Sequence, residues 1–257
     1  MIVRADTHVH LYPCHDLRAA LDGARAHLDR AGAAPADARL LLLTERRADR
    51  MFASLRDGTA GDLGRWTPAG GAGGLLPLSA PGGGALHVLA GRQLVTRERL
   101  EVLALATEAE FEDGAPVREA LAAVRAAGGV PVLPWAPGKW FCGRGRIVAA
   151  LIAGSAPGDF WIGDTALRPV GWGEPALMRA AREKGFGVLA GSDPLPFAGE
   201  ERRVGQYGME FDGAFDPARP ADSIRALLAA PGRLLGRRLS FPAVARRLWK
   251  NARRKRE

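Results

Sequence analysis

The chain has 257 residues, of which 47% are hydrophobic and 25% charged, as in an ordinary globular protein. No apolar run approaches the roughly 20 residues of a membrane-spanning helix, no secretion leader is visible, and two isolated cysteines form no disulfide framework. We therefore expect a cytoplasmic protein without a transmembrane segment. The net charge of +8 arises from residues 237–257, which carry nine Arg or Lys and one acid, whereas the other 236 residues are neutral.

The densest group of potential metal ligands lies near the start of the chain. Asp6, His8 and His10 alternate there with other residues, directly after an apolar run. Side chains two apart share one face of a strand, so both imidazoles can point into one pocket. Neutral imidazole is the commonest metal ligand in proteins, and His15 and Asp16 follow at once as further candidates. The alternative is a histidine-rich surface loop, or core histidines held by hydrogen bonds.

Short apolar runs alternate with amphipathic segments along the rest of the chain. Their spacing predicts helices at 16–31, 47–56, 115–127, 145–153, 174–184 and 221–230, and strands at 39–44, 85–95, 100–106, 130–135, 159–163 and 187–191. Only four residues separate the runs 85–95 and 100–106, which predicts a hairpin. Strands that alternate with helices favour a mainly parallel sheet or barrel, with the chemistry at the carboxyl ends of the strands.

Two segments fall outside this alternation. Residues 58–84 hold ten glycines and three prolines, so we expect a long loop there. Residues 1–236, including this loop, are expected to form a single domain, followed by a basic C-terminal helix or tail at 237–257. That helix has one apolar side and one arginine-rich side. It either docks on the domain or touches an anionic surface.

The order of these segments resembles the PHP (polymerase and histidinol phosphatase) family of metal-dependent phosphoesterases. D-T-H-V-H at 6–10 is close to the family's D-x-H-x-H, and G-S-D at 191–193 is similar to its final G-S-D-x-H. The segments 91–105 and 128–133 resemble strands that lie between these motifs in the family. The resemblance implies a distorted (β/α) barrel of about seven mostly parallel strands with one hairpin, and a site with up to three metal ions.

Several ligand positions of that family are substituted in this chain. Arg46, Trp135 and Leu195 each stand at or near the place of a histidine. Gln93 replaces a bridging glutamate, and Glu101 replaces the histidine of the hairpin strand. A three-metal cluster cannot be assembled from the residues that are left.

The intact ligand positions are His8, His10 and Asp193, with His15 or Asp16 near a further one. Two imidazoles and one carboxylate can hold a divalent ion with open coordination positions. We therefore expect one or two ions of zinc, manganese or iron. Asp193 either ligates the ion or acts as a base.

Other residues are candidates for contact with a substrate. Glu101 could be a ligand, an acid–base group or a charged residue at a strand edge. Arg46 suits a phosphate or carboxylate because its planar guanidinium binds such anions through two hydrogen bonds. Arg202 and Arg203 could reach a phosphate at the mouth of the site or remain solvated. Trp135 could wall a ligand or pack in the core.

These features predict a metal-dependent hydrolase, most simply a PHP-type phosphoesterase that acts on a small phosphorylated or otherwise anionic substrate. The substituted positions leave a second hypothesis, in which the chain keeps the fold, has lost turnover and serves as a binding or partner protein. A related amidohydrolase-type enzyme acting on C–N or C–O bonds is a third.

Overall fold

The computed structural model describes residues 1–30, 32 and 34–254. The strands are β1 (Ile2–Val9), β2 (Ala38–Leu43), β3 (Thr67–Pro68), β4 (Leu75–Ser79), β5 (Ala85–Leu89), β6 (Gly91–Val95), β7 (Glu101–Leu105), β8 (Val130–Pro134), β9 (Trp161–Thr165), β10 (Val188–Gly191), β11 (Tyr207–Asp212) and β12 (Arg233–Gly236). The helices are α1 (Leu17–Arg30), α2 (Met51–Arg56), α3 (Val117–Ala126), α4 (Gly143–Ala153), α5 (Ala176–Glu183), the short 3-10 helix η1 (Glu200–Arg203), α6 (Pro220–Leu227) and α7 (Phe241–Arg254).

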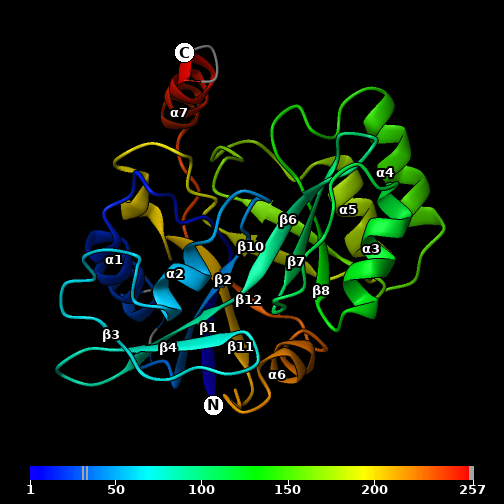
Figure 1. The fold of residues 1–257 in the computed structure, drawn as a ribbon. Coiled ribbons are helices and arrows are strands. Elements are labelled where there is room, and N and C mark those ends of the chain that lie inside the picture. The colour runs from blue at the N-terminus through cyan, green and yellow to red at the C-terminus, as the bar shows by residue number, and fades with distance from the viewer. Residues whose placement is uncertain (31, 33, 255–257) are drawn as a thin grey trace.

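The strands form two mixed sheets (Figure 1). The order is β12-β11-β1-β2-β5-β4-β3 in the seven-stranded sheet and β10-β9-β8-β7-β6 in the five-stranded sheet. Figure 1 shows α3, α4 and α5 on the flank of the five-stranded sheet, and α7 at the end of the molecule opposite the N-terminus. None of the described helices has the length and apolar character needed to cross a membrane.

The prediction of a distorted (β/α) barrel with about seven mostly parallel strands is wrong. Six of the ten strand ladders in the described chain are antiparallel, and the two sheets do not close into a barrel. One isolated bridge, between Glu45 and Arg92, links residues near the ends of β2 and β6. Apolar spacing identifies a strand but specifies neither its partner nor its direction, which is why the arrangement could not be predicted.

The predicted helices are present, and the predicted hairpin is formed by β6 and β7. The segment 58–84, expected to be a loop, contains β3 and β4, and the run 85–95 is divided between the two sheets as β5 and β6. Strand β11 was not predicted because it carries Glu210 among its apolar residues. Glu210 is buried because Nε of Arg4, on the neighbouring β1, donates a 2.8 Å hydrogen bond to it.

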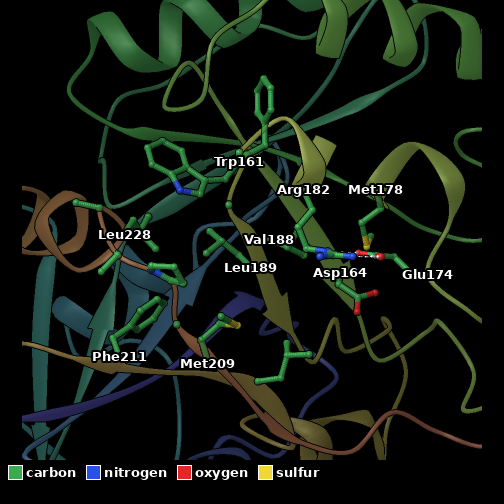
Figure 2. Close-up of a pocket in the computed structure, with 18 of the residues that line it drawn as sticks. Trp161, Asp164, Glu174, Met178, Arg182, Val188, Leu189, Met209, Phe211 and Leu228 are labelled. Atoms are coloured by element: carbon green, nitrogen blue, oxygen red, sulfur yellow. Dashed lines mark hydrogen bonds and ion pairs between the residues drawn. The ribbon is translucent and has the colours of Figure 1, made fainter. Parts of the chain in front are cut away.

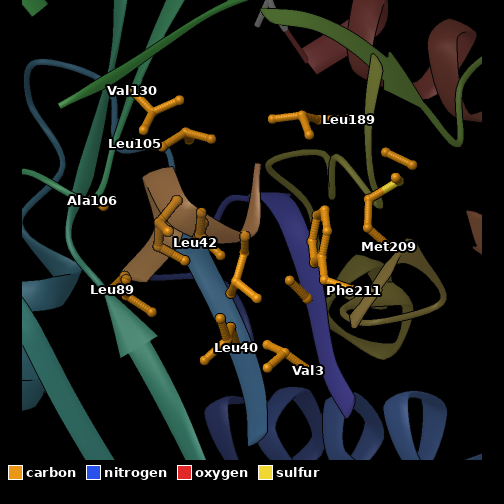
Figure 3. Packing of buried hydrophobic residues seen from close by; sticks show 14 of the residues in the cluster. Val3, Leu40, Leu42, Leu89, Leu105, Ala106, Val130, Leu189, Met209 and Phe211 are labelled. Carbon is orange, nitrogen blue, oxygen red and sulfur yellow. The ribbon is translucent and has the colours of Figure 1, made fainter. Parts of the chain in front are cut away.

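The central core lies between the two sheets (Figure 3). Leu40 and Leu42 of β2 face this core, together with Val3, Leu105, Val130, Leu189 and Phe211 from both sheets. Leu41 and Leu43, on the opposite face of β2, pack against α1 in a second cluster. A strand that is buried on both faces has a continuous run of apolar residues in its sequence. This burial explains the four consecutive leucines at 40–43.

Candidate metal centre

His8 and His10 lie at the carboxyl end of β1, two residues apart and on one face. Their Nε2 atoms are 3.1 Å apart, and each residue is only 4% exposed. The rings meet edge to face, with centroids 5.0 Å apart. The strand therefore brings two imidazole nitrogens to one point, as their alternation predicted.

Asp193 reaches the same point from the end of β10. Its Oδ1 atom lies 3.7 Å from Nε2 of His8 and 3.8 Å from Nε2 of His10. The backbones meet as well, because the N–H of Asp193 donates to the carbonyl oxygen of His8 at 3.0 Å. A Cβ added to Gly191 would lie 2.3 Å from Cβ of His8, so only glycine permits this close approach.

The three ligand atoms fit a single divalent ion. A triangle with sides of 3.1, 3.7 and 3.8 Å has a circumscribed radius of about 2.1 Å, the usual length of a bond from zinc to nitrogen or oxygen. His8, His10 and Asp193 also form the group of potential ligands found within the described part of the chain. A cluster compatible with metal binding is therefore present, and the donor set suits zinc, manganese or iron alike.

Burial adjusts the protonation of these groups. It lowers the pKa of His10 well below its usual value, and the neighbouring His8 and the positive charge of Arg46 act in the same direction. Burial raises the pKa of Asp193, an effect that His8 and Arg247 oppose. His10 is therefore a neutral imidazole, the form that binds metals. The buried Nδ1 atoms of His8 and His10 have no partner among the described residues, so protein groups do not supply the usual second contact of a metal-binding histidine.

Asp6 does not belong to the three-ligand group, although it shares the alternation of His8 and His10. Its carboxylate accepts hydrogen bonds from N–H and Oγ of Ser192 (2.9 and 2.5 Å), from N–H of Gly205 (2.8 Å) and from N–H of His8 (3.2 Å). Burial raises the pKa of Asp6 to about 6, and the hydrogen bonds from Ser192, Gly205 and His8 oppose this rise. Through its hydrogen bonds with Ser192, Asp6 thus connects β1 to the segment that carries Asp193.

His15 and Asp16 lie outside the three-ligand group. Nδ1 of His15 accepts the N–H of Tyr12 at 3.3 Å, and Nε2 lies 3.0 Å from the carbonyl oxygen of Leu195. Both ring nitrogens of His15 therefore contact backbone groups, one at Tyr12 and the other at Leu195. Burial also lowers the pKa of His15. The exposed Asp16 caps α1, since Oδ1 accepts the N–H of Ala19 at 2.9 Å.

Replacement of Asp16 by alanine should lower the free energy of unfolding by about 1 kcal/mol through loss of this helix cap, without changing metal affinity. Chemical denaturation measures the first quantity, and calorimetric titration with Zn²⁺ or Mn²⁺ measures the second. A clear loss of metal affinity in the folded variant would instead make Asp16 a ligand.

The side chains of Tyr12 and Arg46 stack one after the other beside His10. The Tyr12 ring stacks on His10 with an interplanar angle of 18°, and the Arg46 guanidinium carbon lies 4.7 Å from the centroid of the Tyr12 ring. The Arg46 side chain is 48% exposed and pairs with Asp49 at 2.8 Å. It can therefore meet a ligand that arrives from solvent. Sequence patterns contained no signal for the stacking role of Tyr12.

The other predicted residues lie in differing environments. Glu101 is half-buried and accepts a 2.5 Å hydrogen bond from Lys139. Trp135 is 1% exposed, which leaves little of the indole for a ligand to touch. Arg203 pairs with Glu200 at 3.2 Å, whereas Arg202 is exposed.

A cavity of about 500 Å³ is lined by residues of β9, α5, β10 and β11 (Figure 2). Its wall is mostly apolar, with Trp161, Met209 and Phe211 among the lining residues. Its acids are already paired with arginines, Asp164 with Arg168 and Glu174 with Arg182. His8, His10 and Asp193 do not line this cavity, so we place the candidate active site at these three residues, where the potential ligands meet.

Solved structures share the architecture of this chain. PsfC from Pseudomonas syringae PB-5123 superposes with a TM-score of 0.60 at 20% identity, over 99% of this chain and 98% of that one. The lesion-specific endonuclease PfuEndoQ from Pyrococcus furiosus, and a complex of Endonuclease Q with a 27-mer duplex that has an abasic lesion at the active site, each give a TM-score of 0.50, at 10% and 11% identity.

Each endonuclease match covers 91% of this chain, which spans 58% of the endonuclease chain. At these identities the likeness concerns the fold alone. No family model and no curated protein sequence matches the chain.

Proposed function

We propose that this protein is a metal-dependent hydrolase that acts on a small phosphorylated or otherwise anionic molecule. The observation that carries the proposal is the buried triangle of His8, His10 and Asp193, whose dimensions suit one divalent ion. Such an ion, when bound, polarises a substrate oxygen and activates water for attack. The superposition on an endonuclease supports a phosphate ester as the substrate class.

Residues around the triangle supply the contacts that such a substrate needs. Arg46 can bind a phosphate or carboxylate group through two parallel hydrogen bonds, and its stacking on Tyr12 limits its side-chain freedom. Glu101 and Lys139 form an ion pair that could exchange a proton with the leaving group or with water. His10 stays neutral through burial and so keeps a lone pair for the ion.

Elemental analysis and an ester screen test this function. Purified protein should contain close to one equivalent of Zn, Mn or Fe per chain, and should hydrolyse p-nitrophenyl phosphate or bis(p-nitrophenyl) phosphate. The variant Asp193→Asn should reduce kcat/KM by at least about 100-fold. A metal-loaded protein that cleaves generic amide or lactone substrates and no phosphate ester would favour the amidohydrolase alternative.

Replacement of Arg46 by alanine should raise KM for the anionic ester by roughly 10-fold or more and change kcat less, because Arg46 would contact the substrate rather than the ion. Arg47→Ala is the matched control, since Arg47 is also exposed and pairs with Glu112. Equal effects of both variants would contradict a specific role for Arg46.

A binding or partner protein is the second candidate. Trp135 and Leu195 are buried apolar side chains at positions where the resemblance implies metal ligands, and the described chain offers one three-ligand group. Metal-free protein that is fully folded and inactive with every metal tested would favour this candidate.

A further inference from the structure

The C-terminal helix α7 packs on the loop that follows β10 and carries Asp193. Val244 of α7 forms a small apolar cluster with Leu167 and Leu195, and Leu248 packs against the same cluster. The outer face of α7 carries basic side chains, among them Arg246, which makes no ion pair within the described residues. The helix therefore packs against the loop that follows Asp193, beside the candidate metal centre.

Arg247 projects from α7 into this contact. It is 3% exposed, and its partner Glu200, in η1, is 2% exposed. Nε of Arg247 donates to both oxygens of Glu200, at 2.8 and 3.0 Å, while Nη2 donates to the carbonyl oxygen of Asp193 at 3.0 Å. Glu200 in turn accepts the N–H of Leu195 at 3.1 Å. One buried ion pair thus holds the backbone of Asp193 and of Leu195.

The backbone of Asp193 needs such support. Its φ is +48°, in the left-handed region that few residues other than glycine adopt. A conformation of this kind persists when surrounding groups hold it. The N–H of Asp193 donates a hydrogen bond to the carbonyl oxygen of His8, and the carbonyl oxygen of Asp193 accepts one from Arg247. Together these two contacts orient the side chain toward His8 and His10.

A gain in stability does not explain the pair by itself. Removing two charges from water is costly, and buried ion pairs often contribute little more than apolar residues of the same size. Nη1 of Arg247 is also buried without a partner among the described residues. A role in geometry accounts for a buried charge at this position better than a role in stability.

We infer that Arg247 is a positioning residue for the candidate metal centre. Through Glu200 and the carbonyl oxygen of Asp193, it keeps Asp193 in the left-handed conformation that directs its carboxylate toward His8 and His10. This inference rests on the proposed metal site. It assigns a part in metal binding to Arg247 of the C-terminal helix, which lies 54 residues downstream of Asp193.

Metal titration of Arg247→Met tests the inference, with Arg246→Met on the exposed face of α7 as the matched control. Zn²⁺ and Mn²⁺ affinities are measured by competition with a chelator, below the unfolding temperature of every variant. Arg247→Met should bind each ion about 10 to 100-fold more weakly, as is typical when a residue that orients a ligand is lost. Arg246→Met should stay within about twofold of the wild type. A folded Arg247→Met variant with wild-type affinity would overturn the inference, even if its Tm were lower.

Hydrogen–deuterium exchange of the metal-free proteins provides a second readout. Amides of 193–200 should exchange faster in Arg247→Met and in Glu200→Gln than in the wild type, whereas amides of β1 should change little. If Arg247→Met does not fold, Arg247→Lys and Glu200→Gln replace it. Lysine keeps the charge but cannot bind Glu200 and the Asp193 carbonyl in the same fork geometry, so we expect about 10-fold weaker metal binding.

The two proposals can fail separately. A wild-type protein that binds neither ion would refute the proposed metal site, and the positioning of Asp193 would then be decided by exchange alone. Unchanged exchange at 193–200 in all variants would refute the positioning role, whatever the wild type binds.

Discussion

Replacing His8 and His10 together by alanine should remove tight binding of a divalent ion. Two of the three atoms of the triangle are lost, and the Asp193 carboxylate alone holds a zinc or manganese ion weakly. We expect the metal content after dialysis to fall from about one equivalent per chain to background. Hydrolysis of a phosphate ester should fall with it. Elemental analysis of the purified variant measures the metal directly.

The matched control for this variant is His87→Gln. His87 lies on β5 with its ring 5.3 Å from Phe215, away from the three-ligand group. Its replacement removes an imidazole without touching the site, so the metal content should stay at the wild-type level. Full metal content in the double alanine variant, with circular dichroism showing a folded protein, would refute the proposed site.

Replacing Gly191 by alanine should damage both the fold and the site. The new Cβ would lie 2.3 Å from Cβ of His8 and 2.5 Å from its backbone nitrogen, so β1 and β10 would have to separate. Overpacking against backbone that cannot move freely costs about 3 kcal/mol, which corresponds to a fall in Tm of roughly 6–12 °C. Metal affinity should also fall, because Asp193 follows Gly191 by two residues and would move away from His8.

Gly143→Ala provides the control for this prediction. Gly143 begins α4, and an added Cβ would meet no atom within 4 Å. Alanine favours a helix over glycine by up to about 1 kcal/mol, so this variant should be unchanged or slightly more stable. A Gly191→Ala variant with wild-type Tm and metal affinity would show that β1 and β10 are not held as closely as the structure indicates.

Much of the local structure could be predicted from sequence. The apolar spacing of α1 and α3 and the short apolar runs of β2 and β8 predicted these elements to within a few residues. Those patterns depend on neighbours three or four residues apart in a helix and two apart in a strand, and such spacing is visible in any window of sequence. The missed strands contain residues that local rules disfavour. Glu210 in β11 and Pro77 in β4 are examples: Glu210 is paired with Arg4, and Pro77 lies opposite His87 of β5.

The convergence of three candidate ligands could be predicted from sequence, whereas the surroundings of each side chain could not. His8, His10 and Asp193 were expected to meet, and the structure brings them within 3.8 Å of one another. Asp6 shows the same alternation as His8. It does not join the three-ligand group, however, and instead accepts hydrogen bonds from Ser192 and Gly205. Alternation identifies the face of a strand on which a side chain lies, but not which distant donors surround that side chain.

The sequence alone determined which side chains can bind an ion, and that two of them lie on one face of the first strand. Those features follow from covalent order and the twofold repeat of an extended chain. Only the tertiary structure decided that the strands form two mixed sheets, that Gly191 lets β10 approach β1, and that Arg247 reaches the Asp193 carbonyl across 54 residues. Contacts of that kind depend on the free energy of packing the whole chain, which no local pattern reports.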